Sequence, residues 1–553
     1  MTGARSGGQV LADQLVAQGS ELAFCVPGES YLPLLDGLYA HRNRLHVVTC
    51  RHETAAANAA DAYGKLTGQP GVCMVTRGPG ATQAAVGVHT ARQDSTPLIL
   101  LVGQVASGHR GRESFQEIDC EAVFGSMAKG VFELDRVERI PEVVASAFSL
   151  ALGGRQGPVV ISLPEDVLSA AAVVDDAPPA IARQPTADAT QLAGLRALLE
   201  DAQRPLVMVG GGPWNGPSCA RLAEWAGACG LPVAASFRRQ DLVDNELGCY
   251  VGDIGLGVNP ALAQRVRDCD LLIAVGPRLT EIETQGYTLP VPPAAPQTLV
   301  HVHPDPRELG RVYQPTLGIL AGVQSFAAAL LTDVRVDGGR WASWARAGRE
   351  DYERWSALPE AGETLDLGGA IGVLGRELPE DTIYCNGAGN YTVWVHRFTR
   401  YRRWGTQLAP QSGAMGYGIP AALAAQLLNP GRAVVAFAGD GCFQMCGQEL
   451  ATMVAERLPI LVIVANNRML GTIRMHQERR FPGRVMATDL VNPDFAGLAR
   501  AYGAFGERVE QVGELAGALR RARASGGPAL IELMTDPDAL TPSTSLAGLA
   551  ATR

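Results

Sequence analysis

Gly439-Asp440-Gly441, followed further on by Asn466-Asn467, is the stretch of sequence that decides the fold. Each of these two motifs follows a short apolar run, residues 433–438 and residues 460–464, of the kind that forms a buried parallel strand. The intervening residues 447–456 predict a helix. A strand–helix–strand order is typical of an open, doubly wound α/β sheet, in which ligands bind beyond the carboxyl ends of the strands. The aspartate and the second asparagine stand at those ends.

The two motifs carry the groups that a magnesium diphosphate site needs. Asp440 offers a carboxylate oxygen and Asn467 an amide oxygen, which are hard ligands of the kind that Mg²⁺ prefers. Gly441 leaves room for a diphosphate to approach the backbone at the start of a helix. Either motif alone is equally well explained as a turn or as a strand cap. The occurrence of both, each after an apolar strand, favours the metal site.

This pair of motifs resembles the signature of the thiamine diphosphate (ThDP) enzymes, and nearly the whole chain resembles the acetolactate synthase (acetohydroxyacid synthase) large-subunit group of that family. The resemblance implies an α/β fold of three doubly wound parallel-sheet domains. These are a pyrimidine-binding domain at residues 1–174, a central Rossmann-like domain at residues 190–333 and a diphosphate-binding domain at residues 364–540.

The resemblance also implies that ThDP and Mg²⁺ are bound, and by which residues. Mg²⁺ is expected on Asp440, Asn467 and the backbone carbonyl of Met469. Met415 is expected to bend ThDP, so that its 4′-nitrogen approaches the C2 carbon and proton transfer becomes intramolecular. Further cofactor contacts are expected from Pro79, Gln83, Asn390, Tyr391, Gly413, Gly441, Cys442, Leu470 and Gly471. The family has asparagine at the position of Gln83.

Glu53 is the expected acid–base residue. Strand-like and helix-like segments alternate through residues 9–102, and Glu53 stands where a strand-like run meets an alanine-rich helix. A carboxylate at this position is commonly explained by the helix dipole alone. Here the flanking residues 50–53 and 59–64 resemble those around the family's catalytic glutamate. That glutamate bonds N1′ of the aminopyrimidine and so helps to remove the C2 proton.

The resemblance implies a substrate channel lined by Gly28, Phe115, Gln116 and Lys129. Gln116 and His476 are expected to be catalytic together with Glu53 and Met415. The alternatives are core packing for Phe115 and a solvated charge for Lys129. The family has a tryptophan that tunes the acceptor pocket where this chain has His476.

The central third of the chain leaves the nucleotide question open. Residues 206–209 predict a strand that runs into Gly210-Gly211-Gly212, which is not a dinucleotide fingerprint. The resemblance implies a domain that holds FAD in many relatives and another nucleotide or none in others. Residues 278–282 depart from the family pattern, because Ile282 replaces an arginine that helps to bind the carboxylate of the acceptor keto acid.

Length and composition agree with a multidomain globular enzyme. A chain of 553 residues is too long for one core, and 47% hydrophobic with 19% charged residues is typical of folded domains. The net charge of −9 gives no general attraction to nucleic acid or anionic membranes. The sequence has neither a signal-peptide pattern nor an apolar run of about 18 residues. Eleven scattered cysteines indicate reduced thiols. We therefore expect a cytoplasmic protein.

The resemblance implies decarboxylation of a 2-oxo acid such as pyruvate and transfer of the acyl carbanion to an acceptor carbonyl. Ile282 and His476 leave an aldehyde or ketone acceptor open. The alternative is a 2-oxo acid decarboxylase or benzaldehyde-lyase-like enzyme that releases or ligates aldehydes. Release of free aldehyde is less favoured, because His109 is the one histidine in residues 106–118 and the family's decarboxylases have a histidine pair there. A catalytically silent ThDP-binding paralogue is disfavoured by Glu53.

The partners implied are small molecules and a second copy of the chain. In the family the catalytic glutamate reaches the cofactor of a neighbouring subunit, which implies a homodimer or homotetramer with active sites between subunits. Three segments lack a sheet pattern. Residues 175–191 predict a linker, residues 333–364 with three tryptophans predict a helical connector over an interface, and the tail from Thr541 predicts no regular structure.

Overall fold

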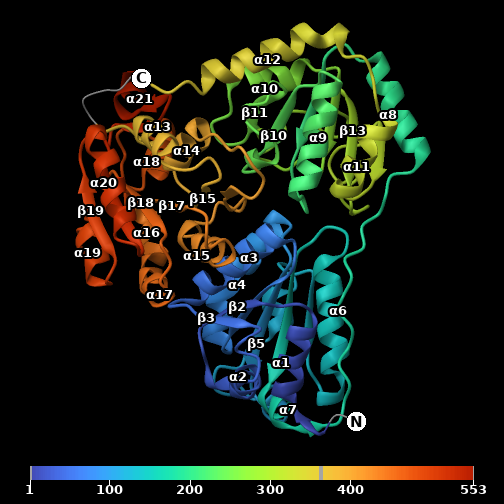
Figure 1. Cartoon of the computed structure of the whole chain (residues 1–553), viewed down its shortest axis with the longest axis vertical. Helices are drawn as coiled ribbons and strands as arrows, with labels where there is room; N and C mark the ends of the chain where they lie inside the picture. The colour runs from blue at the N-terminus through green and yellow to red at the C-terminus, as the bar shows by residue number, and fades with distance from the viewer. Residues whose placement is uncertain (1–2, 360–364, 552–553) are drawn as a thin grey trace. The chain divides into compact units, whose positions relative to one another are not determined.

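The computed structural model describes residues 3–359 and 365–551. Within them, three six-stranded sheets of parallel strands follow one another along the chain, each with helices between its strands (Figure 1). The α/β class with three doubly wound parallel sheets is therefore confirmed. Thr364, the expected start of the third domain and the end of the expected connector, lies outside the described residues.

The first sheet has the strand order β3-β2-β4-β5-β7-β6. Its inner strands β2, β4, β5 and β7 are buried along their whole length, as continuous apolar runs require. The strands are β2 (Leu22–Cys25), β3 (His46–Thr49), β4 (Gly71–Val75), β5 (Leu98–Gln104), β6 (Gly130–Glu133) and β7 (Pro158–Pro164). The helices are α1 (Gly7–Ala17), α2 (Leu32–Tyr39), α3 (Glu53–Thr67), α4 (Gly78–Asp94), α5 (Cys120–Phe124), α6 (Ile140–Leu152) and α7 (Glu165–Ser169). A short antiparallel pair joins β1 (Arg5–Ser6) to β8 (Ala171–Ala172).

The central sheet has a different order, β11-β10-β9-β12-β13-β14, in which the chain starts at the middle and reverses once. Its strands are β9 (Pro205–Val209), β10 (Val233–Ser236), β11 (Tyr250–Ile254), β12 (Leu271–Val275), β13 (Thr298–His303) and β14 (Leu317–Leu320). Its helices are α8 (Ala189–Asp201), α9 (Gly216–Ala228), α10 (Pro260–Asp268) and α11 (Val323–Asp333).

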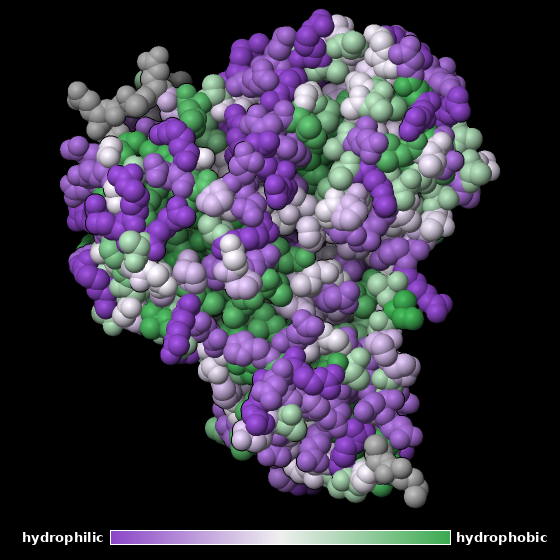
Figure 2. All heavy atoms as spheres, viewed as in Figure 1, coloured by the Kyte–Doolittle hydropathy of each residue, from purple (hydrophilic) through white to green (hydrophobic). Residues whose placement is uncertain are grey.

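The predicted tryptophan-rich connector contains helix α12 (Ala342–Trp355), which packs beside β11 and α10 of the central sheet. Trp341 is fully buried, and the indole of Trp344 donates a hydrogen bond of 2.9 Å to the carbonyl of Pro205. Figure 2 shows polar residues over α12 on the face drawn. The helix therefore covers the central core with its aromatic residues and presents charged ones outward.

The third sheet repeats the strand order of the first, as β16-β15-β17-β18-β20-β19. Its strands are β15 (Ile383–Asn386), β16 (Gln407–Leu408), β17 (Val434–Gly439), β18 (Leu461–Asn466), β19 (Phe505–Val509) and β20 (Ala529–Met534). Its helices are α13 (Leu367–Glu377), α14 (Tyr391–Phe398), α15 (Gly418–Leu428), α16 (Asp440–Cys446), α17 (Leu450–Ala455), α18 (Gly471–Arg480), α19 (Phe495–Ala501) and α20 (Val512–Ala524). The helix expected at residues 447–456 is thus preceded by a turn of helix that starts at Asp440.

By its contacts the chain divides into two compact units that are not contiguous in sequence. The first unit contains residues 3–183 together with residues 410–430 and 444–458, so α15 packs against α3. The second unit contains the central sheet and all six strands of the third sheet. The three domain boundaries given above stay a prediction.

The tail does have regular structure, so the expectation for residues after Thr541 was wrong. A short hairpin, β21 (Ala539–Thr541) with β22 (Thr544–Ser545), leads into helix α21 (Leu546–Ala551). Leu540, Leu546 and Leu549 pack against Met469 and Met475. The tail has no strong local pattern of its own and is ordered by this tertiary contact.

No helix in the described part of the chain combines the length and the apolar character that crossing a bilayer requires.

Candidate cofactor-binding site

Asp440 and Asn467 lie at the same edge of the third sheet. Strand β17 ends at Gly439, directly before Asp440, and β18 ends at Asn466, directly before Asn467. The two strands are parallel neighbours, with Gly439 opposite Ala465. The structure therefore brings the two halves of the motif together at the carboxyl edge, as the sequence predicted.

Asp440 is a buried carboxylate surrounded by donors. Only 3% of the residue is exposed, and its two oxygens accept hydrogen bonds of 2.8 Å from the N–H of Gly441 and from Nδ2 of Asn492. Burial raises the pKa of Asp440, while these donors and the N–H groups of Arg468 and Met469 act in the opposite direction. A buried carboxylate of this kind is well placed to hold a cation.

Asn492 was not among the residues expected at the site. Its Nδ2 also donates to Oδ1 of Asn466 at 2.9 Å, and Nδ2 of Asn466 donates to Oε1 of Glu532 at 2.7 Å. Glu532 is buried on β20 and so fixes which way the amide of Asn466 points. A chain of hydrogen bonds thus runs from Glu532 to Asp440. Asn492 lies 52 residues beyond Asp440, so the short spacing of the two motifs gave no sign of this contact.

A glycine keeps the space beside Asn467 open. Oδ1 of Asn467 accepts from the N–H of Met469 at 3.2 Å, and the N–H of Leu470 donates to the carbonyl of Thr488. Helix α18 then begins at Gly471. A Cβ on Gly471 would lie 3.2 Å from Nδ2 of Asn467, so the glycine leaves space between the N-terminus of the helix and the asparagine. An anionic group would be stabilised in that space by the helix N-terminus.

Asn390 adds a donor with no partner. It stands in the loop between β15 and α14, where the strand order of the sheet reverses. Its Oδ1 accepts a hydrogen bond of 2.8 Å from Thr472, whereas its Nδ2 is buried and has no hydrogen-bond partner. A buried, unsatisfied amide donor is costly unless a ligand supplies the acceptor.

Tyr391, the residue after Asn390, is in contact with Cys442. The hydroxyl of Tyr391 accepts from the N–H of Gly387 at 3.0 Å and donates to the carbonyl of Phe437 at 3.3 Å. The thiol of Cys442 lies 3.4 Å from the same hydroxyl. Burial raises the pKa of Tyr391 well above its usual value. The hydroxyl of Tyr391 therefore links the loop after β15 to the end of β17.

Glu53, Pro79 and Gln83 come together in the first unit. Glu53 is the first residue of α3, and His52 caps that helix by accepting a hydrogen bond from Thr54. A Cβ on Gly80 would lie 3.3 Å from Oε1 of Glu53, so the carboxylate lies against the first turn of α4, which contains Pro79. The carbonyl of Gln83, one turn further on, accepts from Oγ1 of Thr54 at 2.6 Å.

Glu449 supports the turn before Glu53 and was also missed. It is fully buried, and its carboxylate accepts from the N–H of Arg51 at 2.8 Å and from Oγ1 of Thr452 at 2.6 Å. Burial raises the pKa of Glu449, while these hydrogen bonds oppose the shift. This buried carboxylate fixes the backbone two residues before the candidate acid–base group.

Gly28 and Gln116 lie near the start of α4. A Cβ on Gly28 would fall 2.6 Å from Cβ of Thr76, so the loops after β2 and β4 touch where the strand order reverses. The carbonyl of Gln116 accepts from the N–H of Gly78 at 2.9 Å, and its Oε1 is buried with no hydrogen-bond partner. Phe115 beside it is 74% exposed.

Lys129 does not join this group. It stands directly before β6, at the amino edge of the sheet, whereas Gly28 and Glu53 follow strands at the carboxyl edge. Its ammonium group donates to the carbonyls of Leu150 and Gly153, at the end of α6. A cation at the carboxyl end of a helix is stabilised by the helix dipole, so Lys129 has a structural explanation within its own domain.

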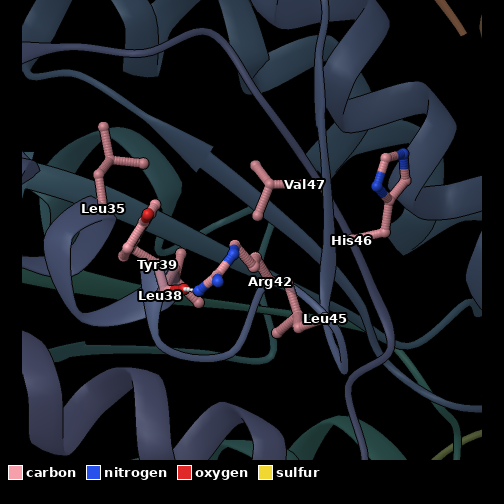
Figure 3. Close-up of a pocket in the computed structure, with 7 residues that line it drawn as sticks. All are labelled: Leu35, Leu38, Tyr39, Arg42, Leu45, His46 and Val47. Carbon is pink, nitrogen blue, oxygen red and sulfur yellow. Dashed lines mark hydrogen bonds between the residues drawn. The ribbon is translucent and has the colours of Figure 1, made fainter.

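A surface pocket also lies at this amino edge and is separate from the residues above (Figure 3). Among its lining residues, the guanidinium of Arg42 donates a hydrogen bond of 2.9 Å to the carbonyl of Tyr39. The pocket is lined by Leu35, Leu38, Tyr39, Arg42, Leu45, His46 and Val47.

The remaining predicted residues lie on a loop and on a helix surface. Gly413 has a φ of 71°, which only glycine adopts readily, and it precedes the half-exposed Met415 in the loop before α15. His476 is exposed on α18, in the second unit.

The donor set of the third sheet suits a small, hard cation. It combines one carboxylate with amide and carbonyl oxygens, and the described residues include no cluster of three or more His, Cys, Asp or Glu that could hold a metal. Such a site leaves coordination positions for water and phosphate, as Mg²⁺ requires.

The central sheet offers no comparable set of groups. A Cβ on Gly211 would lie 2.1 Å from the carbonyl oxygen of Gly276, and one on Gly276 would lie 2.4 Å from that of Gly210. Both loops follow strands at the reversal point of this sheet, and they touch each other there. Packing thus explains these glycines, and FAD stays a prediction.

Comparison with known families assigns the three parts of the chain. Residues 5–123 match the model described as thiamine pyrophosphate enzyme, N-terminal TPP binding domain. Residues 192–330 match the central domain, and residues 387–533 match the C-terminal TPP binding domain. The chain belongs to the thiamine pyrophosphate enzyme family, and the two groups of site residues fall in or next to its two TPP-binding domains.

The chain is also similar along its length to curated relatives. It is 31% identical to the acetolactate synthase large subunit of Corynebacterium glutamicum, with 97% of this chain and 87% of that protein aligned. It is 30% identical to the acetolactate synthase isozyme 2 large subunit of Escherichia coli, with 96% of each aligned. It is 30% identical to the probable acetolactate synthase large subunit of Methanocaldococcus jannaschii, over 96% of this chain and 92% of that protein. The predicted resemblance is confirmed.

Proposed function

We propose that the protein uses ThDP and Mg²⁺ to decarboxylate a 2-oxo acid and to transfer the acyl carbanion to an acceptor carbonyl. The observation that carries this proposal is a pairing within one chain. Glu53 begins α3 in the part matched to one TPP-binding domain, and the Asp440–Asn467 oxygen set lies in the other. Similarity to acetolactate synthases over nearly the whole length supports the reaction type.

In this mechanism the third sheet anchors the cofactor. Asp440, Asn467 and the carbonyl of Met469 would hold Mg²⁺, and the partnerless Nδ2 of Asn390 would donate to a diphosphate oxygen. The N-terminus of α18 at Gly471 adds a favourable dipole. These contacts bind and orient the cofactor and take no part in the chemical step.

Glu53 would act at the other end of the cofactor. Its carboxyl group would share a proton with N1′ of the pyrimidine, and Pro79 and Met415 would support the ring. When bound, ThDP supplies a carbon nucleophile and an acceptor for the electrons released with CO₂. Gln116, with its unsatisfied Oε1, is the residue beside Pro79 that could donate to or accept from a substrate.

The proposal includes a dimer as the smallest working unit. Glu53 of one subunit would act on the cofactor held by Asp440 of the partner subunit. Mixing two inactive variants, Glu53→Gln and Asp440→Ala, tests this directly. Mixed dimers would contain one intact site, so subunit exchange should restore activity. No recovery, with exchange verified by mass spectrometry of tagged chains, would mean that each chain supplies both groups of its own site.

Incubation of the purified protein with ThDP, Mg²⁺ and a panel of 2-oxo acids tests the reaction. We expect CO₂ release and, with a second 2-oxo acid or an aldehyde present, a new C–C bond in the product. Free aldehyde without ligated product would assign the lyase or decarboxylase alternative. Binding of ThDP without CO₂ release from any of the acids would assign the silent paralogue. A flavin absorbance band in the purified protein would decide FAD.

The acceptor is the least constrained part of the proposal. Ile282, which replaces the expected carboxylate-binding arginine, is half-buried after β12, and His476 is exposed on α18. Ile282 offers no charge to pair with the carboxylate of a second 2-oxo acid. An uncharged aldehyde or ketone acceptor is therefore favoured, and competition between pyruvate and an aldehyde for the same donor would measure the preference.

A further inference from the structure

A buried charge cluster joins α3 and α4, and its members are not among the residues expected to bind the cofactor. Its centre is Lys65, whose ammonium group is 2.9 Å from a carboxylate oxygen of Asp61 and in contact with a carboxylate oxygen of Asp94. The side chains of Lys65, Asp61 and Asp94 are 7%, 0% and 2% exposed. Burial raises the pKa of Asp61, and Lys65 acts in the opposite direction.

One end of the loop 411–417 is bound to this cluster. The hydroxyl of Tyr417 accepts a hydrogen bond of 2.9 Å from Nζ of Lys65 and donates one of 2.7 Å to Oδ2 of Asp61. The ammonium group also lies 4.4 Å from the centre of the Tyr417 ring. The hydroxyl, the cation and the carboxylate therefore fix one another.

The other end of the loop is bound to the same cluster. Oδ1 of Asp94 accepts a hydrogen bond of 2.8 Å from the N–H of Gln411. One turn earlier on α4, Oγ1 of Thr90 lies 3.1 Å from Oγ of Ser412. Asp94 thus contacts Lys65 with one oxygen and the loop backbone with the other.

The segment between these two ends contains Met415. Gly413, at a φ of 71°, is exposed, and a Cβ there would meet nothing within 4 Å. Gly416, at a φ of 83°, is packed so tightly that a Cβ would lie 3.0 Å from Cβ of Met445. The loop therefore has two fixed ends and an open centre.

We infer that Lys65, Asp61, Asp94 and Tyr417 are positioning residues that clamp both ends of the loop 411–417 and so hold Met415 in place before the cofactor binds. This inference rests on the proposed function, because it assigns Met415 to the cofactor. Buried charge clusters seldom add stability beyond what apolar side chains would give. This one bonds the backbone and a hydroxyl of a loop, which packing between α3 and α4 does not require.

The variant Tyr417→Phe removes one hydroxyl and leaves the Lys65–Asp pairs in place. We expect ThDP to bind about tenfold more weakly in the presence of Mg²⁺, the effect of one lost hydrogen bond to a charged group. We also expect slower exchange of the C2 hydrogen of bound ThDP with deuterium at saturating ThDP. The matched control is Tyr63→Phe, the same substitution at a buried tyrosine of α3, which should change neither quantity.

Affinity is measured by titration calorimetry, exchange by NMR of acid-quenched cofactor, and folding by thermal denaturation. If the wild-type protein does not bind ThDP, the proposed function fails. If it binds, and Tyr417→Phe matches Tyr63→Phe in affinity and exchange, only the clamp is overturned. If Tyr417→Phe does not fold, the variant Ser412→Ala tests the clamp at the other end of the loop by the same two measurements. Weaker binding and slower exchange there would support the clamp, and unchanged values would overturn it.

Discussion

The first and third sheets share one strand order, and the central sheet has another. In the two matching sheets the loops at the reversal point carry side chains that can act on a ligand, Glu53 and Gln116 near one and Asp440 and Asn390 at the other. In the central sheet the equivalent loops touch each other through Gly211 and Gly276. The carboxyl edge is thus a suitable place for a site, and the side chains decide whether one exists.

The same contrast holds for two aspartates at strand ends, the buried Asp440 and the half-buried Asp253. Asp440 is surrounded by amide donors that favour its charged form. Asp253, on β11 of the central sheet, accepts one hydrogen bond of 3.0 Å from Gln240, and burial raises its pKa to about 7. Burial raises the pKa of both carboxyl groups, but several donors around Asp440 oppose that shift.

The largest expected effect is on the first sheet. Glu53→Gln should lower kcat by about a thousandfold, because general acid–base catalysis contributes about 10²–10⁴-fold, while ThDP still binds. Steady-state kinetics and calorimetry check this. Glu142→Gln, at an exposed first-turn glutamate of α6 in the same domain, is the control and should have wild-type kcat. An unchanged kcat in Glu53→Gln would show that Glu53, and with it this edge of the first sheet, does not take part in catalysis.

The second largest effect is expected at the loops of the central sheet that contain Gly211 and Gly276, where a substitution should lower the free energy of unfolding. Gly211→Ala would force a side chain into a φ of 60° and against the Gly276 carbonyl, which should cost about 3 kcal/mol of unfolding free energy. Gly216→Ala, at a position with nothing within 4 Å, is the control and should be neutral or slightly stabilising. Chemical denaturation measures both. A harmless Gly211→Ala would indicate that the central crevice is open.

Asp253 predicts a pH dependence with a definite sign. Its pKa in the folded protein is raised, so the folded state binds the proton more tightly and the stability that it adds is lost as pH rises towards 7. The variant Asp253→Asn keeps the Gln240 contact and should reduce the loss of unfolding free energy between pH 5 and pH 7 by about 2 kcal/mol. Identical pH profiles for both proteins would show that Asp253 is charged when folded.

Asn492 should have the smallest effect of the four. Asn492→Ala removes a donor to Asp440 and should weaken Mg²⁺ binding by about tenfold, at the lower end of what partners of metal ligands contribute. Calorimetric titration of Mg²⁺ with ThDP present measures it. Asp489→Ala, at a side chain that is 83% exposed beside Arg474, is the control for general charge effects. An equal loss of Mg²⁺ affinity in both variants would show that Asn492 has no specific role in binding the cation.

Much of this could be predicted from the sequence because the signals are local. Apolar runs ending at Gly439 and Asn466 predict parallel strands, and strand ends predict where Asp440 and Asn467 meet. The structure of the tail could not be predicted in this way, because Leu546 and Leu549 are ordered by packing against Met469 and Met475, which are distant in sequence. Lys129 stands before strand β6, at the amino edge of the first sheet, and its expected place in a substrate channel stays a prediction.

The sequence by itself determined the class of fold, the order of the three sheets and the positions of the Gly439–Gly441 and Asn466–Asn467 motifs at strand ends, because these depend on periodicity and on short spacing. Only the tertiary structure decided that residues 410–430 pack with the first sheet, that Asn492 contacts Asp440 and that Glu449 supports the turn before Glu53. Those contacts join residues far apart in the chain, and their energies come from burial and hydrogen-bond geometry, which no local pattern encodes.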